Sequence, residues 1–191
     1  YLSTAQATEL LDIYHLRKFR FVPFHELGAL SHESLAIDAY LADLAAAFDF
    51  ERLRKFRVVV DCCNGTSSLL LQRLNEQYGF SFILINAATD GRHFAHSPAT
   101  NARTVALQLA PLIQPLQAQA GFLFDVDSDR VALATEQGEP VSEELVFPLI
   151  ADHCLPQAEG RVVITNLSTT GLIEEIAARQ DRKSTRLNSS H

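Results

Sequence analysis

The sequence contains no methionine and no tryptophan, and only three cysteines, Cys62, Cys63 and Cys154. Adjacent cysteines do not readily bridge to each other, and the lack of a C-x-x-C pair excludes the usual disulfide and zinc patterns. We therefore expect buried free thiols in a reducing cytoplasm. A nucleophilic role for Cys62 or Cys63 stays open, because the pair precedes an expected helix start, where a thiol pKa can be lowered.

Basic residues are also scarce. The chain has 16 lysines and arginines against 23 aspartates and glutamates, a formal net charge of −7 over 191 residues. Nucleic acids and anionic membrane surfaces attract basic clusters, so we expect neither as a partner. No apolar run is long enough to cross a membrane, and no secretory signal is visible. The hydrophobic content of 47% is typical of a globular protein with a real core.

The segment 181–191 has no apolar periodicity and resembles the translation of a sequencing-adapter oligonucleotide. We interpret it as a non-native tail and exclude it from the expected fold; the alternative is an ordinary polar, disordered C-terminus. The chain also lacks an initiating Met. These features predict that both ends are truncated relative to a longer gene.

Short apolar runs alternate with helical segments along the rest of the chain, which predicts an α/β fold with a mixed, mostly parallel sheet and helices on both faces. Strands are expected at 57–61, 81–86, 121–124, 131–135 and 161–165. Helices are expected at 4–14, 34–48, 67–78, 101–119, 142–154 and 169–180, with caps at Ser31 or Ser34, at Ser142 and at Ser168–Thr170.

An acidic loop follows the strand expected at 121–124. Asp125, Asp127 and Asp129 alternate in it, and Arg130 closes it. Open α/β sheets bind their ligands at the carboxyl ends of strands. Mg²⁺ prefers carboxylate and phosphate oxygens, and three adjacent negative charges repel each other unless a cation neutralises them. The pattern predicts a Mg²⁺ site that faces phosphate; the alternative is a solvated turn.

Two other loops should reach the same sheet edge. Asp61 and the Asn64-Gly65 turn follow the strand at 57–61, and right-handed crossovers place such strand ends together. Asn-Gly is a common turn pair, although its N–H groups are also suited to an anion. His93 and His96 lie in the loop 87–100 without a third metal ligand of suitable spacing, so we expect solvated or structural roles for them.

Four motifs follow one another in a fixed order: Val58-Val-Val-Asp-Cys-Cys-Asn-Gly65, then Asn86 with Asp90-Gly91, then Asp125-Val-Asp-Ser-Asp-Arg130, then Gly138 with Ser142-Glu-Glu-Leu145. This order resembles the α-D-phosphohexomutase superfamily, the phosphoglucomutase/phosphomannomutase enzymes, over about 34–180. The resemblance implies that 34–138 is the metal-loop α/β domain, that 1–33 ends a preceding domain and its linker, and that 139–180 starts the following α/β domain.

The resemblance also implies a reaction. Such enzymes move a phosphoryl group between the 1 and 6 positions of a hexose phosphate, through an enzyme phosphoserine and a sugar bisphosphate, with Mg²⁺ as cofactor. It implies Asp125, Asp127 and Asp129 as the Mg²⁺ ligands, and it places Arg130 beside the phosphoserine. This agrees with the general need of phosphoryl transfer for charge neutralisation and positioning. Glucose, mannose and glucosamine phosphates stay open as substrates, as does the oligomeric state.

Two departures from the family pattern carry expectations of their own. Val126 stands where the family has glycine, and a β-branched residue is strained where glycine takes a positive φ. The family's catalytic Ser-His-Asn-Pro-like run has no match, because Ser31-His32 is followed by Glu33-Ser34. We therefore expect the chain as given to be catalytically inactive.

Two rival interpretations of the acidic loop remain. In a haloacid-dehalogenase-type phosphatase, Asp125 would be the nucleophile and Asp127 the general acid, but Asp129 stands where Thr or Val is usual. In a calcium-binding EF-hand, the three aspartates and Glu136 would occupy positions 1, 3, 5 and 12, but Arg130 replaces the required glycine. A dinucleotide site is not expected, because no G-x-G-x-x-G follows the first strand.

Overall fold

The structure is a computed structural model that describes residues 2–32, 35–158, 160 and 162–187. Its internal contacts divide the chain into two units, 1–36 and 37–191. The first unit holds helix α1 (Thr4–His15) and the 3-10 helix η1 (Phe24–Glu26). Within the described part of the chain, no helix has the length and apolar character needed to cross a bilayer.

Helix α1 confirms the first expected helix. Ser3 and Gln6 form a capping box, in which the Ser3 hydroxyl accepts from the Gln6 N–H at 3.4 Å and the Ser3 N–H donates to the Gln6 side chain at 2.9 Å. None of its residues is buried, and Leu10 and Leu11 are each 56% exposed. The apolar residues of this helix therefore contribute to no core within the described part of the chain.

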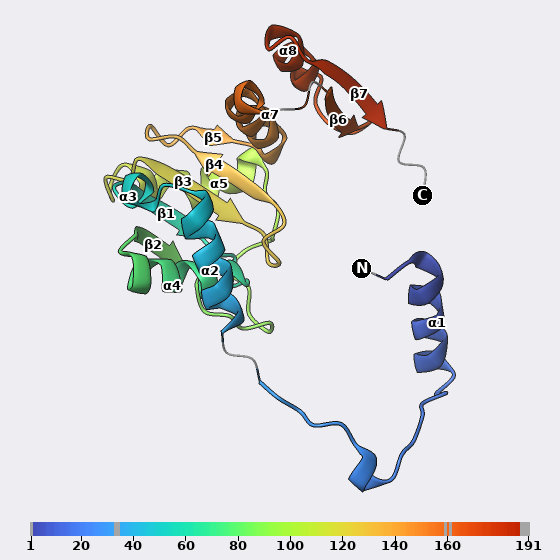
Figure 1. Ribbon diagram of the computed structural model, residues 1–191. Helices are drawn as coiled ribbons and strands as arrows, with labels where there is room; N and C mark the ends of the chain where they lie inside the picture. The colour runs from blue at the N-terminus through green and yellow to red at the C-terminus, as the bar shows by residue number, and fades with distance from the viewer. Residues whose placement is uncertain (1, 33–34, 159, 161, 188–191) are drawn as a thin grey trace. The chain divides into compact units, whose positions relative to one another are not determined.

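The second unit is built on a five-stranded sheet with the order β2-β1-β3-β4-β5 (Figure 1). Strand β1 pairs in parallel with β2 and β3, while β4 runs antiparallel to β3 and β5 antiparallel to β4. The strands are β1 (Arg57–Asp61), β2 (Ser81–Ile85), β3 (Ala120–Phe124), β4 (Val131–Ala134) and β5 (Pro140–Val141). This confirms the expected mixed, mostly parallel α/β sheet.

Helices cover both faces of this sheet. On one face, α2 (Ala36–Ala47) and α4 (Ser67–Tyr78) pack on Val58 and Val60 of β1. On the other face, α5 (Ala102–Gln108) and α6 (Ala110–Ile113) pack on Val59. Alternate side chains of one strand thus enter two separate cores, as a strand covered on both sides requires.

Gly121 in β3 permits the second of these packings. A Cβ at that position would lie 2.7 Å from side-chain carbons of Ile113 and Leu109. The helix expected over 101–119 is broken in two and ends earlier, at Ile113, and Pro111 lies in the first turn of α6, where its missing N–H costs nothing.

Several expected caps differ in the structure. Ser142 precedes helix α7 (Glu143–Cys154), but its side chain makes no cap hydrogen bond. Helix α8 (Leu172–Arg179) starts after Gly171, and only the Thr170 hydroxyl reaches its first N–H, at 3.4 Å. Ser31 lies too far before Ala36 to cap α2, and Ser34 is outside the described residues. The short helices α3 (Phe50–Leu53) and η2 (Leu155–Gln157) were not expected.

Residues 183–187 of the tail take part in the fold, contrary to the expected exclusion of this segment, while its non-native origin stays a prediction. Strand β7 (Lys183–Leu187) pairs in parallel with β6 (Val162–Asn166), in a sheet of two strands. Arg186 also forms an ion pair with Glu174 of α8 at 2.6 Å. The polar sequence of this tail gave no strand signal. Strand pairing needs only backbone N–H and C=O groups, and the edge of β6 presents these groups to any extended segment.

Candidate metal centre

The end of β1 and the acidic loop after β3 touch through their backbones. The Thr66 N–H donates to the Val126 carbonyl at 3.0 Å. A Cβ at Gly65 would lie 2.7 Å from the carbonyl carbon of Val126 and closer still to its oxygen, so only glycine fits here without a shift. The expectation that Asp61, the Asn64-Gly65 turn and the acidic loop share one sheet edge is confirmed.

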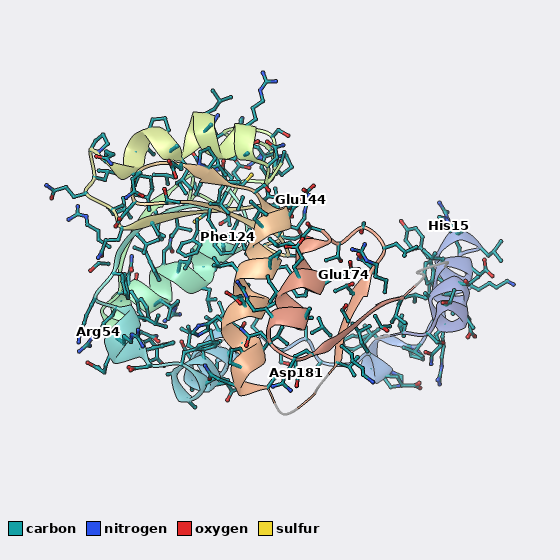
Figure 2. All side chains as sticks on the ribbon, turned by 90° about the horizontal axis from the view of Figure 1, so that it is seen from above. His15, Arg54, Phe124, Glu144, Glu174 and Asp181 are labelled. Carbon is teal, nitrogen blue, oxygen red and sulfur yellow. The ribbon has the colours of Figure 1, made fainter. Side chains whose placement is uncertain are left out.

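The three aspartates of the loop converge on one point. One carboxylate oxygen from each of Asp125, Asp127 and Asp129 lies within 4.8 Å of the others. Asp125 is 2% exposed, at the end of β3, whereas Asp127 and Asp129 are exposed. Figure 2 labels Phe124, the residue before Asp125. A triad of hard oxygen donors with one buried anchor fits a divalent cation such as Mg²⁺.

Arg130 closes the loop onto Asp125. Its backbone N–H donates to Asp125 Oδ1 at 3.2 Å, and its Nε–H donates to Asp125 Oδ2 at 2.8 Å. The Asp125 N–H in turn donates to the Arg130 carbonyl at 3.3 Å. Arg130 Nε also lies 3.6 Å from Asp129 Oδ1. The arginine therefore fixes the buried carboxylate while its own side chain stays half exposed.

The carboxylates of the triad repel one another, as expected of adjacent negative charges. Burial opposes ionisation of Asp125, but hydrogen bonds from the Arg130 N–H, the Asp129 carboxyl and the Arg130 guanidinium keep its pKa below the usual value. The hydrogen bond to Asp125, with the charges of Asp125 and Asp127, raises the pKa of Asp129. Asp125 likewise raises the pKa of Arg130. A cation placed among the three carboxylates would relieve this repulsion.

Val126 does not take the positive φ that would strain a β-branched residue, which agrees with the expectation that the position tolerates valine or that the loop is reshaped. Among the described residues of this loop, the positive φ falls on Ser128, at 64°. The Ser128 hydroxyl lies 3.3 Å from the Thr66 hydroxyl, a second contact between the two loops. The left-handed residue of the loop thus lies two positions after Val126.

Comparison with known proteins decides the family. Residues 38–138 match the family model described as phosphoglucomutase/phosphomannomutase, alpha/beta/alpha domain II. The chain belongs to the phosphoglucomutase/phosphomannomutase family. A phosphoglucomutase/phosphomannomutase of Thermococcus kodakarensis is 29% identical over 174 residues, which are 90% of this chain and 38% of that protein. The chain thus spans little more than a third of this relative.

Solved structures of the phosphohexomutases share the fold. A phosphoglucomutase/phosphomannomutase family protein of Burkholderia thailandensis superposes with a TM-score of 0.72 at 20% identity, over all of this chain and 40% of its own. An N-acetylphosphoglucosamine mutase of Aspergillus fumigatus, in complex with glucose 1,6-bisphosphate, superposes with a TM-score of 0.54 at 18% identity, over 80% of this chain and 32% of its own.

The chain also contains a buried contact between His96 and Asp61 that the sequence did not indicate. His96 Nε2 lies 2.9 Å from Asp61 Oδ2, and the two side chains are 5% and 0% exposed. Asp61 Oδ1 accepts from the Cys63 N–H at 2.9 Å and from Asn86 Nδ2 at 3.0 Å. His93, in contrast, is an exposed partner of Asp90. The expected structural or solvated roles of the two histidines are confirmed.

A second unforeseen cluster joins the acidic loop to α7. The Glu143 N–H donates to the Thr100 carbonyl at 3.4 Å, and the Thr100 hydroxyl donates to Glu143 Oε2. The same oxygen lies 4.0 Å from Arg130 Nη1. An acidic residue in the first turn stabilises a helix through the helix dipole, and this is the only signal that the sequence gives for Glu143. The signal does not reveal the partners of its side chain.

The cysteines are partly as expected. Cys62 and Cys63 are buried free thiols, and burial raises the pKa of both, which opposes a nucleophilic role. Cys154 is exposed, so the expectation of burial is wrong for it, because the last turn of α7 turns it toward solvent.

The rival interpretations of the acidic loop are contradicted. The match of residues 38–138 to the phosphoglucomutase/phosphomannomutase domain opposes a haloacid-dehalogenase-type phosphatase with Asp125 as nucleophile. An EF-hand loop leads into a helix, whereas strand β4 follows here.

Proposed function

We propose that this chain carries the Mg²⁺ loop of a phosphohexomutase, an isomerase that moves a phosphoryl group between the 1 and 6 positions of a hexose phosphate. The observation that carries the proposal is the convergence of three carboxylates within 4.8 Å at the end of a buried strand. Family membership supports it, since residues 38–138 match the second domain of such enzymes. In this proposal 34–138 is the metal-loop domain and 139–180 begins the next.

Each loop residue has a role in this proposal. Asp125, Asp127 and Asp129 hold Mg²⁺, and Arg130 contacts the phosphate of an enzyme phosphoserine. When bound, Mg²⁺ supplies positive charge that neutralises phosphoryl oxygens. The chain's own part is positioning: Arg130 fixes Asp125 through two hydrogen bonds, and the backbone contact of Thr66 with Val126 fixes the loop. The Arg130 side chain is 51% exposed, which leaves N–H groups available for phosphate.

The substrate class follows from the relatives. One is a phosphoglucomutase/phosphomannomutase, and a structural neighbour holds glucose 1,6-bisphosphate. We propose that the phosphoryl group passes through an enzyme phosphoserine and a bisphosphate of this kind, with glucose, mannose and glucosamine phosphates as candidate substrates. A cytoplasmic location stays a prediction from the cysteine content.

The 191-residue chain alone should be inactive. Its Ser31-His32-Glu33-Ser34 run does not match the phosphoserine segment of the family, and without a phosphorylated serine no phosphoryl group is available for transfer.

The test is a coupled assay that follows glucose 1-phosphate to glucose 6-phosphate with Mg²⁺ and glucose 1,6-bisphosphate. We expect turnover by the protein that includes this chain and a phosphoserine segment, and a loss of at least about a hundredfold in its Asp127→Ala variant, because charge stabilisation of this kind is worth that much. Turnover that survives EDTA and Asp127→Ala, or turnover by the 191-residue chain, would contradict the proposal.

A further inference from the structure

We propose that Glu143 is a positioning residue for Arg130, and that Thr100 holds Glu143 in place for this role. The inference rests on the proposed function in one respect, namely that Arg130 is the phosphate-contacting residue of the acidic loop. It adds a series of contacts: Thr100, in the loop before α5, contacts Glu143, in the first turn of α7, and Glu143 lies beside the Arg130 guanidinium.

The first step is how Glu143 is held. Thr100 is 1% exposed, and it contacts Glu143 twice: its carbonyl accepts from the Glu143 N–H at 3.4 Å, and its hydroxyl donates to Glu143 Oε2. The first contact satisfies one of the free N–H groups at the start of α7. The second fixes the rotamer of the carboxylate. Ser142, the residue placed to cap this helix, makes no such bond.

The second step is what Glu143 does to Arg130. The guanidinium is anchored at Nε by Asp125 at 2.8 Å, and Nη1 lies 4.0 Å from Glu143 Oε2. One hydrogen bond lets a planar guanidinium rotate, whereas a second negative charge beside a different nitrogen favours one orientation of its plane. Asp129, 3.6 Å from Nε, is a competing partner on the metal side. At 4.0 Å Glu143 is beyond hydrogen-bond range, so it acts on Nη1 through its charge and favours the orientation in which Nη1 faces α7.

The third step is where these residues lie in the fold. Thr100 ends the loop before α5, Arg130 ends the acidic loop, and Glu143 starts α7. Figure 2 labels Glu144, the next residue in this first turn of α7. In the proposed division at 138, Glu143 belongs to the following domain. The orientation of Arg130 then depends on the contact between two domains, so that a movement of α7 reaches the metal loop through Glu143.

The interaction is of modest strength, because Arg130 and Glu143 are 51% and 37% exposed and water screens their charges. Its effect is on orientation rather than on stability. The measurement must therefore report on the Arg130 side chain itself.

The experiment measures the exchange of the Arg130 Nε proton with water by NMR of the ¹⁵N-labelled, metal-free 191-residue chain. The signal is assigned by its loss in Arg130→Lys. Thr100→Val removes the hydroxyl without changing any charge, and Thr100→Ser retains the hydroxyl. Glu143→Gln removes the carboxylate, and Glu144→Gln makes the same change at its exposed neighbour.

We expect exchange to be about two- to fivefold faster in Thr100→Val and in Glu143→Gln, the range for an exposed ion pair. Thr100→Ser and Glu144→Gln should match the wild-type chain. A rate in either Thr100→Val or Glu143→Gln that matches these controls would overturn the proposal. Mg²⁺ titration of the same samples tests the proposed function separately: if the wild-type chain binds no Mg²⁺, that function fails, while the exchange rates still decide the role of Glu143.

Discussion

At the scale of single residues, the position of the acidic loop depends on the approach of Gly65 to the backbone of Val126. The contact leaves no room for a Cβ, and the neighbouring Thr66 N–H donates to the Val126 carbonyl at 3.0 Å. The obstacle is main chain rather than a flexible side chain, so it cannot move at low cost. The lack of a side chain at Gly65 therefore permits the close approach that positions the acidic loop.

Gly65→Ala should destabilise the fold by about 1–3 kcal/mol, the usual cost of overpacking, and weaken Mg²⁺ binding by displacing the loop. Urea denaturation and a Mg²⁺ titration measure the two effects. Gly91→Ala is the matched control, because a Cβ at Gly91 would meet no atom within 4 Å, and its effect should stay within about 0.5 kcal/mol. Equal stability of the two variants would contradict the role given to Gly65.

Magnesium binding should weaken as the pH falls through the pKa of Asp129. Asp125 raises that pKa above the ordinary aspartate value of about 3.9, so Asp129 takes up its proton at a higher pH than a free aspartate. The cation must displace this proton, and affinity is therefore complete only above the raised pKa and falls below it.

Titration calorimetry in buffers of different ionisation enthalpy measures this effect. Proton release should appear as a buffer-dependent heat of binding near the pKa of Asp129. An affinity that stays constant from about pH 7 to below about pH 4 would show that Asp129 is not a ligand.

At the scale of elements, the loop between β2 and α5 is tied to the sheet by His96. Its Nδ1 lies 2.7 Å from the Ser97 carbonyl and its Nε2 lies 2.9 Å from Asp61 Oδ2. Asn64 adds two contacts, as Nδ2 donates to the Ala88 carbonyl at 2.9 Å and Oδ1 accepts from the Ala95 N–H at 3.0 Å. This loop therefore packs against the turn that supports the metal loop.

His96→Ala should cost about 3 kcal/mol, because it leaves one oxygen of the buried Asp61 carboxylate without its hydrogen-bond partner. Two hydrogen bonds to Asp61 Oδ1 remain, which keeps the loss at the lower end of the range for broken buried pairs. His93→Ala is the control, since His93 is 83% exposed and should change stability by no more than about 0.5 kcal/mol. Similar urea midpoints for both variants would contradict the structural role of His96.

Local patterns predicted the central elements well. The strands β1, β2 and β3 and helix α4 lie within a residue of their expected bounds, because continuous apolar runs and helical spacing are local signals. Strand β5 has two residues and α3 has four, too few for a periodic pattern. Strand β7 is polar and forms by pairing with an open strand edge, which no local pattern encodes.

The candidate metal centre likewise contains residues that local sequence patterns predicted and residues that they did not. The acidic triad was predictable, because its three aspartates lie within five residues of one another at a strand end. The pairs His96–Asp61 and Thr100–Glu143 were not, since their members are separated by 35 and 43 residues in the sequence. Such pairs exist only once the sheet has brought the loops to one edge.

At the scale of the whole molecule, the chain is shorter than its relatives and covers 38% of the length of one of them. The second unit, 37–191, contains the sheet, the acidic loop and α7, and therefore every residue of the candidate metal centre. The triad places three carboxylates at one point, beside the single positive charge of Arg130, and this local excess of negative charge favours a cation. Metal binding is thus a property that the 191-residue chain should show without the rest of an enzyme.

The most direct measurement is a calorimetric Mg²⁺ titration of this chain at neutral pH, beside Asp127→Ala and the control Asp43→Ala, which changes an exposed aspartate on α2. We predict one binding site in the wild-type chain, the same affinity in Asp43→Ala, and affinity at least about tenfold lower in Asp127→Ala. No binding by the wild-type chain, or equal affinity in all three proteins, would contradict the assignment of the triad as a magnesium site.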